Sequence, residues 1–576
     1  MMKFGGSSVG DGQRIRNVAG IVGAFAEREG TPAVVVSAMQ GVTDALIRAA
    51  EAASRRENGL LHRAIAELYA RHEEAAAEVA PSEERDALLA EVHALIRDFE
   101  NLCAAVGVLG ELTPRGLDAV ASFGERLSAR LTAAALRREG YAARALEASG
   151  FIVTDARHGA ASPQWEPTRE RTRAAVLPLL AEGTIPVITG FIGATPEGVV
   201  TTLGRGGSDF SASIVASCLD ANEIWIWTDV DGVMTADPRI VPEARTLPEL
   251  SYAEAAELSY FGARVIHPKT VLPAVERGIP IRIKNTFNPD GPSTLITSSP
   301  VEGASTVKAI TAIKGLSLVT VEGRGMIGVP GIAAKVFSAV AREGISVLMI
   351  SQSSSEQNIC FAIRSEEAAR ALDALKAAFA PELVARNVDR IWAEDGVAIV
   401  AAVGKGMRRT PGIAAKLFGA LGKAGINVIS IAQGSSEHNI SLVVSEAQVE
   451  DAVRAIHREF GLGKGRDGED PRGGVGGHRD GGPVVRALAL PSSLVRDRGR
   501  GGLGALGGGA LRGGGALDLP RGDTGGGTGI AGGPPRTGDP REDRLLGPPG
   551  GCSGTRGGRV CPCRLCGLLQ RPQPSL

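Results

Sequence analysis

The chain has 576 residues, with 63 lysines and arginines against 64 aspartates and glutamates, for a formal net charge of −1. This length predicts several domains. The near-zero charge argues against a nucleic-acid-binding protein or a polybasic membrane protein. The chain has no uninterrupted run of about 18 apolar residues, so no transmembrane helix is predicted. The N-terminus leaves no room for a signal peptide, and the seven cysteines favour a reduced, cytoplasmic protein over a disulfide framework.

Residues 1–10, MMKFGGSSVG, predict a strand with Lys3, a turn at Gly5 and Gly6, and a helix that begins near Val9. The glycines let backbone N–H groups approach an anion, and the helix N-terminus and the lysine add positive charge. The pattern favours a phosphate site, although two glycines after a strand are equally typical of an ordinary tight turn. A Walker A spacing is absent. Because a buried strand usually has more residues before it, we hypothesise that the true start codon lies upstream.

A helix is predicted over roughly residues 11–29 and a buried parallel strand over residues 31–39. Open α/β sheets bind ligands beyond the carboxyl ends of their strands. The loop at that end of this strand contains Ser37, Gln40, Gly41, Thr43 and Asp44.

Residues 45–105 have helical spacing and predict a helical hairpin without a catalytic role. We interpret its histidines, His62, His72 and His93, as surface or packed side chains rather than metal ligands. Residues 117–128 predict a helix or turn that presents Glu125, which taken alone would be a solvated helix charge. Further strands are predicted near residues 142–146 and 185–189.

Residues 201–211, TTLGRGGSDFS, are the most informative stretch. Three glycines around Arg205 permit a backbone nest for an anion, and the guanidinium suits a carboxylate or a phosphate. Asp209 stands where a helical run over residues 210–219 begins, so helix capping is the alternative role. A cap, however, does not require an arginine embedded in glycines.

A strand over residues 223–228 opens into residues 229–239, DVDGVMTADPR. Three aspartates there suit a nucleotide–Mg²⁺ loop, because Mg²⁺ prefers carboxylates together with phosphate oxygens. An Asx-rich turn is the alternative. Residues 279–285 predict the last strand. The alternation of strands and helices predicts an α/β protein, a doubly wound α/β/α sandwich with a mainly parallel sheet.

Six motifs occur in the order found in aspartate kinases of the amino acid kinase superfamily, which residues 1 to about 462 resemble. They are KFGGSSVG, VVVSAMQGVTD, FGERLSA, TTLGRGGSD, WTDVDGVMTADPR and SYFGARVIHPKTVLPA. The resemblance implies the amino acid kinase fold, ATP and Mg²⁺ as cofactors, and L-aspartate as substrate. The reaction would transfer the γ-phosphoryl group of ATP to aspartate and give 4-phospho-L-aspartate, the first step toward lysine, threonine and methionine.

The same resemblance implies roles for individual residues. Lys3 would stabilise the transferring phosphoryl group, and Asp209 would hold that lysine. L-Aspartate would contact Arg205 through its α-carboxylate, Glu125 through its amino group, and also Ser37, Thr43, Gly206, Gly207 and Ser208. ATP would contact Lys3, Gly5, Gly6, Ser7, Thr228, Asp229, Met234, Arg239 and Arg264.

Two of these positions depart from the family pattern. Met234 replaces a tyrosine of many relatives, so ring stacking on adenosine is lost. Arg264 replaces a lysine, which keeps the charge but changes its geometry.

Residues 306–462 contain a repeat with a period of about 81 residues, which indicates a duplicated module. Pro330-Gly331 recurs as Pro411-Gly412, and the segment from Gln352 to Asn358 recurs with Gln433 and Asn439 at its ends. Each copy predicts a small α+β sandwich and resembles an ACT domain, the amino-acid-sensing module of such kinases.

The ACT resemblance implies an amino-acid effector, threonine or lysine, and the Ser-Ser-Glu-x-Asn pattern favours threonine. The effector's carboxylate would lie on the N–H groups at a helix start. The residues involved would be Gly331, Ile332, Ala333, Gln352, Asn358, Gln433 and Asn439. In one of the two copies we expect these polar residues only to complete turns and dimer contacts. Paired modules also imply a homodimer or homotetramer.

We therefore predict a catalytic domain over residues 1–300, ACT domains over 301–385 and 386–462, and a tail over 463–576. A strand near 306–314 is expected to join the second ACT domain. The tail is rich in Gly, Arg and Pro and predicts disorder. Its cysteines match no four-ligand zinc pattern, and it lacks the interleaved aromatic residues of an RNA-binding segment. We hypothesise a frameshift or read-through product.

No strand–GxGxxG–helix unit follows residue 462, so the homoserine dehydrogenase region of bifunctional relatives is not predicted. Two alternatives stay open. One is another amino acid or carbamate kinase of the same fold, against which Arg205, Glu125 and the paired modules argue. The other is a non-catalytic amino-acid-sensing protein with an inactive kinase domain, against which Lys3, Arg205 and Asp209 argue.

Overall fold

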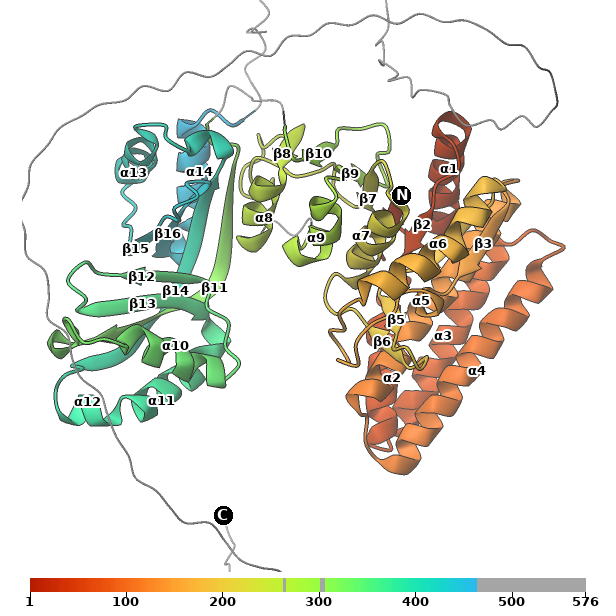
Figure 1. Ribbon diagram of the computed structural model, residues 1–576, viewed down its shortest axis with the longest axis horizontal. Helices are drawn as coiled ribbons and strands as arrows, with labels where there is room; N and C mark the ends of the chain where they lie inside the picture. The colour runs from red at the N-terminus through yellow and green to blue at the C-terminus, as the bar shows by residue number, and fades with distance from the viewer. Residues whose placement is uncertain (263–265, 301–305, 464–576) are drawn as a thin grey trace, which may run out of the picture. The chain divides into compact units, whose positions relative to one another are not determined.

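The computed structural model describes residues 1–262, 266–300 and 306–463. Figure 1 labels its helices and strands in chain order. Arg264 and the tail from residue 464 onward, with the predictions made for them, lie outside the described residues. In the described part of the chain, no helix combines the length and the apolar character that crossing a membrane requires.

The N-terminal part of the chain folds around an eight-stranded sheet with the strand order β3-β4-β2-β1-β7-β9-β10-β8. All neighbouring strands in it are parallel except β9 and β10, which are antiparallel. The predicted doubly wound fold with a mainly parallel sheet is confirmed. The strands are β1 Met2–Phe4, β2 Val34–Val36, β3 Ala143–Leu146, β4 Ile185–Thr189, β7 Ile224–Thr228, β8 Glu249–Ser251, β9 Ile281–Asn285 and β10 Thr294–Thr297; a separate ribbon pairs β5 Ile192–Ala194 with β6 Val200–Thr202.

Helices cover both faces of this sheet. Val34 and Val36 of β2 lie in one core with α1 to α5, whereas Val35 lies in a second core on the other face with α6 to α9. Burial on both faces explains why the strand is an unbroken apolar run. The helices are α1 Gly12–Glu29, α2 Val42–Ser54, α3 Asn58–Val79, α4 Arg85–Leu109, α5 Pro114–Arg138, α6 Trp165–Ala181, α7 Gly207–Leu219, α8 Tyr252–Tyr260 and α9 Pro268–Glu276.

The prediction that residues 279–285 form the last strand of this sheet is wrong. β10 follows β9 and pairs with it antiparallel, and β8 then pairs parallel with β10 at the edge of the sheet. Strands of three and four residues are too short to give a periodic signal in the sequence. Their conformation depends on the partner strand, which only the tertiary structure supplies.

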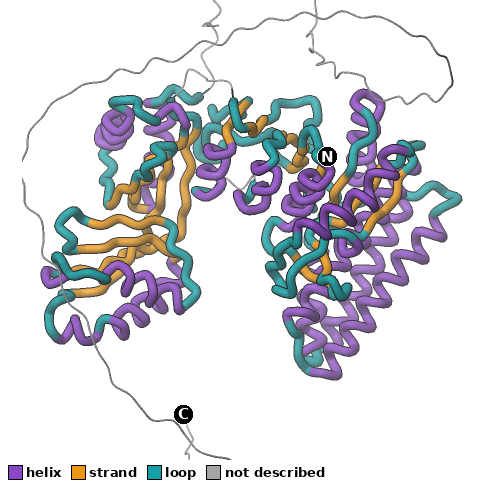
Figure 2. Tube along the Cα trace, viewed as in Figure 1, coloured by secondary structure: helices purple, strands orange, loops and turns teal. Residues whose placement is uncertain are grey.

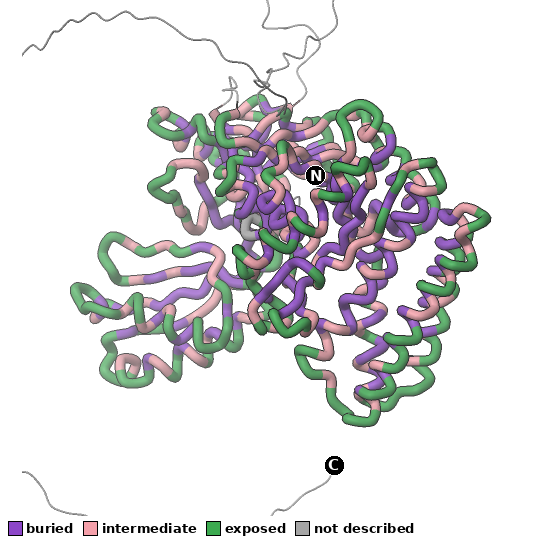
Figure 3. Tube along the Cα trace, turned by 45° about the vertical axis from the view of Figure 1, so that its right-hand side comes forward, coloured by how far each residue is buried: buried purple, intermediate pink, exposed green. Residues whose placement is uncertain are grey.

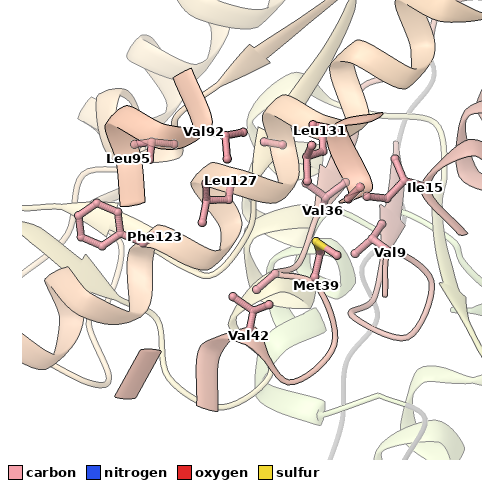
Figure 4. Packing of buried hydrophobic residues seen from close by; sticks show 14 of the residues in the cluster. Val9, Ile15, Val36, Met39, Val42, Val92, Leu95, Phe123, Leu127 and Leu131 are labelled. Carbon is pink, nitrogen blue, oxygen red and sulfur yellow. The ribbon is translucent and has the colours of Figure 1, made fainter. Parts of the chain in front are cut away.

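The predicted helical hairpin consists of α3 and α4, which lie side by side in Figure 1. Figure 3 shows that the hairpin buries one side and exposes the other. His72 is fully buried, and His93 pairs with Glu73 on the exposed side. In Figure 4, Leu127 and Leu131 of α5 lie between α4 and the strand-and-loop segment around Met39, so α5 is fixed at the centre of this core.

The C-terminal part of the described chain forms a six-stranded antiparallel sheet with the order β12-β13-β11-β14-β16-β15. In Figure 2 its strands run side by side and helices flank them. The strands are β11 Ala309–Glu322, β12 Met349–Gln352, β13 Asn358–Arg364, β14 Arg390–Val403, β15 Ser430–Ala432 and β16 Asn439–Ser445. The helices are α10 Ile332–Arg342, α11 Ala368–Ala378, α12 Ala380–Val384, α13 Ile413–Lys423 and α14 Val449–Glu459.

The two modules share their long central strands. Ile310, at the start of β11, packs in the core of the second module, whereas Val321, at its end, packs in the core of the first. Ile391 and Val400 show the same division along β14. Each strand is long enough to serve both cores, which joins the two repeats into one continuous sheet.

Helix α8, which packs on the eight-stranded sheet, contacts the second module through the buried carboxylate of Glu254. Glu254 is fully buried, and its Oε2 lies 2.9 Å from Nζ of Lys308. Its two oxygens also accept hydrogen bonds from the backbone N–H groups of Ser251 and Lys405, at 2.8 and 2.7 Å. These bonds hold the pKa of Glu254 below its usual value against the opposing effect of burial. A charge removed from water needs such partners to be stable.

We therefore expect Lys308→Met to lower the free energy of unfolding by about 3 kcal/mol, because it leaves the buried Glu254 carboxylate without its counter-charge. Lys314→Met is the matched control, since Lys314 pairs with Glu450 on the surface, where a single ion pair contributes little. Urea midpoints of both variants provide the measurement. Equal midpoints would show that the Lys308–Glu254 pair does not stabilise the fold.

Candidate functional site

A cavity of about 650 Å³ lies at the carboxyl ends of β1 and β2, beside the N-terminus of α7. It gathers residues that are far apart in the sequence. The substrate residues implied by the resemblance all line it: Ser37, Thr43, Glu125, Arg205, Gly206, Gly207 and Ser208. Lys3, Gly6 and Asp209 line it as well.

A lysine–aspartate pair stands at the cavity wall. Nζ of Lys3 lies 2.7 Å from Oδ1 of Asp209, and both side chains are largely buried. Asp209 belongs to the first turn of α7, and Gly206, with a φ of 72°, is the N-cap of that helix. The alternative role of Asp209 as a helix cap is therefore wrong. The carboxylate instead fixes the lysine in place and adds negative charge near the helix's positive end.

Glu125 is almost completely buried, at 4% exposure, in the middle of α5. Among the described residues, its Oε2 has no hydrogen-bond partner. Burial raises the pKa of Glu125 to about 8, although a backbone N–H, that of Ala38, opposes the rise. A buried, unpaired polar atom on a residue that lines a cavity points to a ligand with a complementary group. The sequence pattern alone predicts that Glu125 is a solvated helix charge, because it does not show that the neighbouring strands and loops cover this helix.

The turn after β1 is closed by two backbone hydrogen bonds, Ser8 N to Gly5 O and Val9 N to Gly6 O, at 2.9 and 3.3 Å. The predicted helix start near Val9 is wrong, because α1 begins at Gly12. The carboxylate of Asp11 accepts a hydrogen bond from the N–H of Arg14 at 2.8 Å and caps the helix there. The turn therefore contributes to the cavity wall through Gly6, and the start of α1 does not.

Arg71 of α3 is a contact that the sequence did not indicate. Its guanidinium donates to the carbonyl oxygen of Gly10 at 2.9 Å and to that of Gln40 at 2.7 Å. It thereby ties the turn after β1 to the loop after β2. The residue lies in an Arg- and Glu-rich helix, so no local signal distinguished it from a solvated surface charge.

Of the described residues expected to contact the nucleotide, Lys3 and Gly6 line the cavity and the others do not. Thr228 ends β7, next to the turn after β1, where the N–H of Gly5 donates to Trp227 O at 3.2 Å. The Arg239 side chain is 88% exposed and pairs with Asp237 at 2.7 Å. Met234 packs against the core of the second module.

A second cavity, of about 320 Å³, lies in the first module at the start of α10. Four of the predicted effector residues line it, Gly331, Ile332, Ala333 and Gln352. In the second module the side chain of Asn439 donates a hydrogen bond to Glu257 of α8. The two repeats therefore present different surroundings at equivalent positions.

Comparison with known proteins places the chain in a family. The model of the amino acid kinase family matches residues 1–285, and the ACT domain model matches residues 319–379 and 400–460. Aspartokinase 1, chloroplastic, of Arabidopsis thaliana is 35% identical over 487 residues, which cover 80% of this chain and 80% of that protein. The chain belongs to the aspartokinase family. The predicted resemblance, including the tandem ACT domains, is confirmed.

Other members of the family are similar over the same region. The bifunctional aspartokinase/homoserine dehydrogenase 1, chloroplastic, of Zea mays is 40% identical over 468 residues, 80% of this chain and 50% of that protein. The chain thus spans about half the length of several of the curated relatives it matches. The crystal structure of E. coli aspartokinase III in complex with lysine and aspartate has 31% sequence identity and a TM-score of 0.66, and the match covers 80% of this chain and 98% of that one.

The raised pKa of Glu125 predicts how stability depends on pH. A carboxyl group whose pKa is about 8 when folded and about 4.5 when unfolded stabilises the folded state fully below pH 4.5. This contribution is lost as the pH rises toward 8. The urea midpoint of Glu125→Gln should therefore fall less than that of the unsubstituted protein between pH 5 and pH 8. Glu67→Gln, at an exposed position of α3, is the control; identical pH profiles for all three proteins would contradict the assignment.

Proposed function

We propose that this protein is an aspartate kinase, which transfers the γ-phosphoryl group of ATP to the β-carboxylate of L-aspartate and gives 4-phospho-L-aspartate. One observation carries the proposal. A single cavity is lined by the Lys3–Asp209 pair, the Arg205 guanidinium and the buried, unpaired Glu125 carboxyl group. These groups complement a phosphate, a carboxylate and an ammonium group, respectively, and L-aspartate carries the last two next to the carboxylate that reacts.

The reaction needs charge placement more than proton transfer. The β-carboxylate of aspartate is already ionised at neutral pH and attacks the γ-phosphorus directly, while the bond to the β-phosphate oxygen breaks and ADP leaves. The protein must hold two anions together and offset their repulsion. Lys3, fixed by Asp209, supplies a full positive charge, and the backbone N–H of Gly6, which lines the cavity, supplies a dipole.

Arg205 and Glu125 would orient the substrate. The guanidinium forms a two-point contact with the α-carboxylate, which directs the side-chain carboxylate toward Lys3. The ammonium group of aspartate would lie next to Glu125, and its charge favours the ionised carboxylate. Substrate binding would then release a proton from a group that is largely protonated in the free protein.

ATP and Mg²⁺ are proposed as the cofactors. A solved E. coli aspartokinase III structure contains aspartate and ADP, which supports a nucleotide site in this family. Among the described residues, no group of three or more His, Cys, Asp or Glu side chains forms a metal cluster. Mg²⁺ typically retains waters and phosphate oxygens as ligands, so it would enter with ATP and touch the protein through Asp229 or Asp231 at the end of β7.

We propose further that an amino acid, threonine or lysine, inhibits the enzyme through the first ACT module. The cavity there has room for one amino acid beside the N–H groups at the start of α10. Helix α8 contacts both modules, since Tyr260 Oη donates to Leu348 O of the first at 3.0 Å and Glu254 pairs with Lys308. A homodimer or homotetramer and a cytoplasmic location complete the proposal.

Purified protein should release ADP from ATP and Mg²⁺ only when L-aspartate is present. Lys3→Met should lower kcat by about 10²- to 10³-fold, equivalent to about 3–4 kcal/mol, because a charge on the transferring group is lost. Lys423→Met removes an exposed lysine that also pairs with a glutamate and should leave kcat unchanged. Trapping the acyl phosphate with hydroxylamine identifies the product. ADP release that does not depend on aspartate would contradict the proposal.

The two modules carry equivalent glutamines, so a substitution in the second module can serve as the control for the proposed effector site in the first. Gln352→Ala should raise the effector concentration for half-inhibition by about 10-fold or more, because Gln352 lines the cavity of the first module. Gln433→Ala changes the equivalent residue of the second module and should leave inhibition intact. Threonine and lysine are tested separately in the ADP-release assay. Equal effects of the two substitutions would show that both modules bind effector.

A further inference from the structure

A second carboxylate reaches the substrate cavity from α5. Asp118 lines the cavity and is 2% exposed. It lies seven residues before Glu125, about two helical turns away, and therefore on the same side of α5. None of the roles described above involves it.

The partners of Asp118 come from two other segments of the chain. Oδ1 accepts hydrogen bonds from Thr202 Oγ1 at 2.5 Å and from the N–H of Gly159 at 3.0 Å. Oδ2 lies 2.7 Å from Nδ1 of His158. Both oxygens are therefore engaged by the protein itself, which favours a positioning role for Asp118 over direct contact with the substrate.

These contacts adjoin the segment that carries Arg205. Thr202 ends β6 and is followed by Leu203 and Gly204. A side chain added at Gly204 would place its Cβ 3.0 Å from the carbonyl oxygen of Gly159, so the loop after β6 rests directly on the loop that Asp118 holds. Ala161 N donates to Thr202 O at 2.9 Å and connects the same two segments.

The Arg205 segment needs such a support. Gly204 and Gly206, on either side of the arginine, both have positive φ, at 78° and 72°, and Gly207 follows. Glycines lose more conformational freedom on ordering than other residues, so a loop built from them has many alternative conformations. A guanidinium binds a carboxylate at two points only if its own position is fixed.

We propose that Asp118 is a positioning residue that fixes the Arg205 loop, through Thr202 and the His158-Gly159 segment, in the conformation that binds the α-carboxylate of the amino-acid substrate. This inference rests on the proposed function, because it concerns the same substrate. A positioning role differs from a purely structural role in which kinetic constant changes. Loss of Asp118 should weaken aspartate binding far more than ATP binding or the chemical step.

Asp118→Asn tests the proposal, because the amide presents one acceptor oxygen where three donors converge. The KM for aspartate should rise by about 10-fold or more, while the KM for ATP changes by less than about twofold and kcat at saturating aspartate by less than about threefold. Ser122→Ala is the matched control. Ser122 is also buried in α5, but its hydroxyl donates within the helix, to Ala119 O.

Thr202 provides a second, milder test in case Asp118→Asn does not fold. Thr202→Val keeps the side-chain shape but removes one donor to Asp118 and should raise the KM for aspartate by about threefold or more. Thr202→Ser restores the hydroxyl and should lower that KM again. Thermal unfolding of each variant shows whether it is folded.

The outcomes separate the two proposals. Aspartate-dependent ADP release by the unsubstituted protein, with an unchanged KM for aspartate in Asp118→Asn and Thr202→Val, would overturn the positioning role alone. A similar rise in both KM values, together with a fall in kcat of the same size, would also overturn the positioning role, in favour of a general structural role. ADP release without dependence on aspartate in the unsubstituted protein would overturn the proposed function and this inference with it.

Discussion

The ion pair between Lys3 and Asp209 is the interaction on which the candidate site depends. It joins the central strand β1 to the first turn of α7, which lies about 200 residues further along the chain. Lys3 alternates with Met2 and Phe4 along β1, whose side chains fill the core on the other face. A lysine at this position would be costly to bury without a counter-charge. Because Asp209 supplies that charge, the lysine stays in a fixed position at the edge of the cavity.

Helix α5 contributes two further carboxyl groups to the cavity wall, those of Asp118 and Glu125. It is buried along most of its length, since apolar residues on its other faces pack against α4 and the sheet. A long helix that is fixed in this way can hold Asp118 and Glu125 in place with little freedom. The two carboxyl groups have different surroundings: one is saturated by donors of the protein, and the other keeps a free oxygen. We infer positioning for the first and ligand binding for the second from that difference.

The contacts between the ACT modules and the kinase domain would connect the proposed regulation to the nucleotide side of the site. The loop after β7 packs its Met234 and Ala236 into the core of the second module. His457 of α14 is hydrogen-bonded to Thr235 of that loop at 3.0 Å, and Thr235 O accepts from the N–H of Ile310 at 2.8 Å. A shift of the second module would therefore displace the loop that is expected to bind ATP. This arrangement would give the proposed effector of the first module a physical route to the proposed nucleotide site through the shared strands β11 and β14.

The sequence by itself determined the doubly wound sheet and the duplicated modules, because these depend on local signals, and the resemblance of its motifs to a family implied most of the residues around the cavity. Apolar runs, glycine turns and fixed-period repeats can be recognised in a short window of residues. The tertiary structure decided the rest. It buried Glu125 and completed the sheet with β8 and β10, and it brought Asp209 to Lys3, the partner that the family resemblance implies. It also made two similar repeats unequal, since only in the second does the equivalent asparagine, Asn439, meet Glu257 of α8. Each of these outcomes depends on a partner from a distant segment, and no local pattern records which segment will lie there.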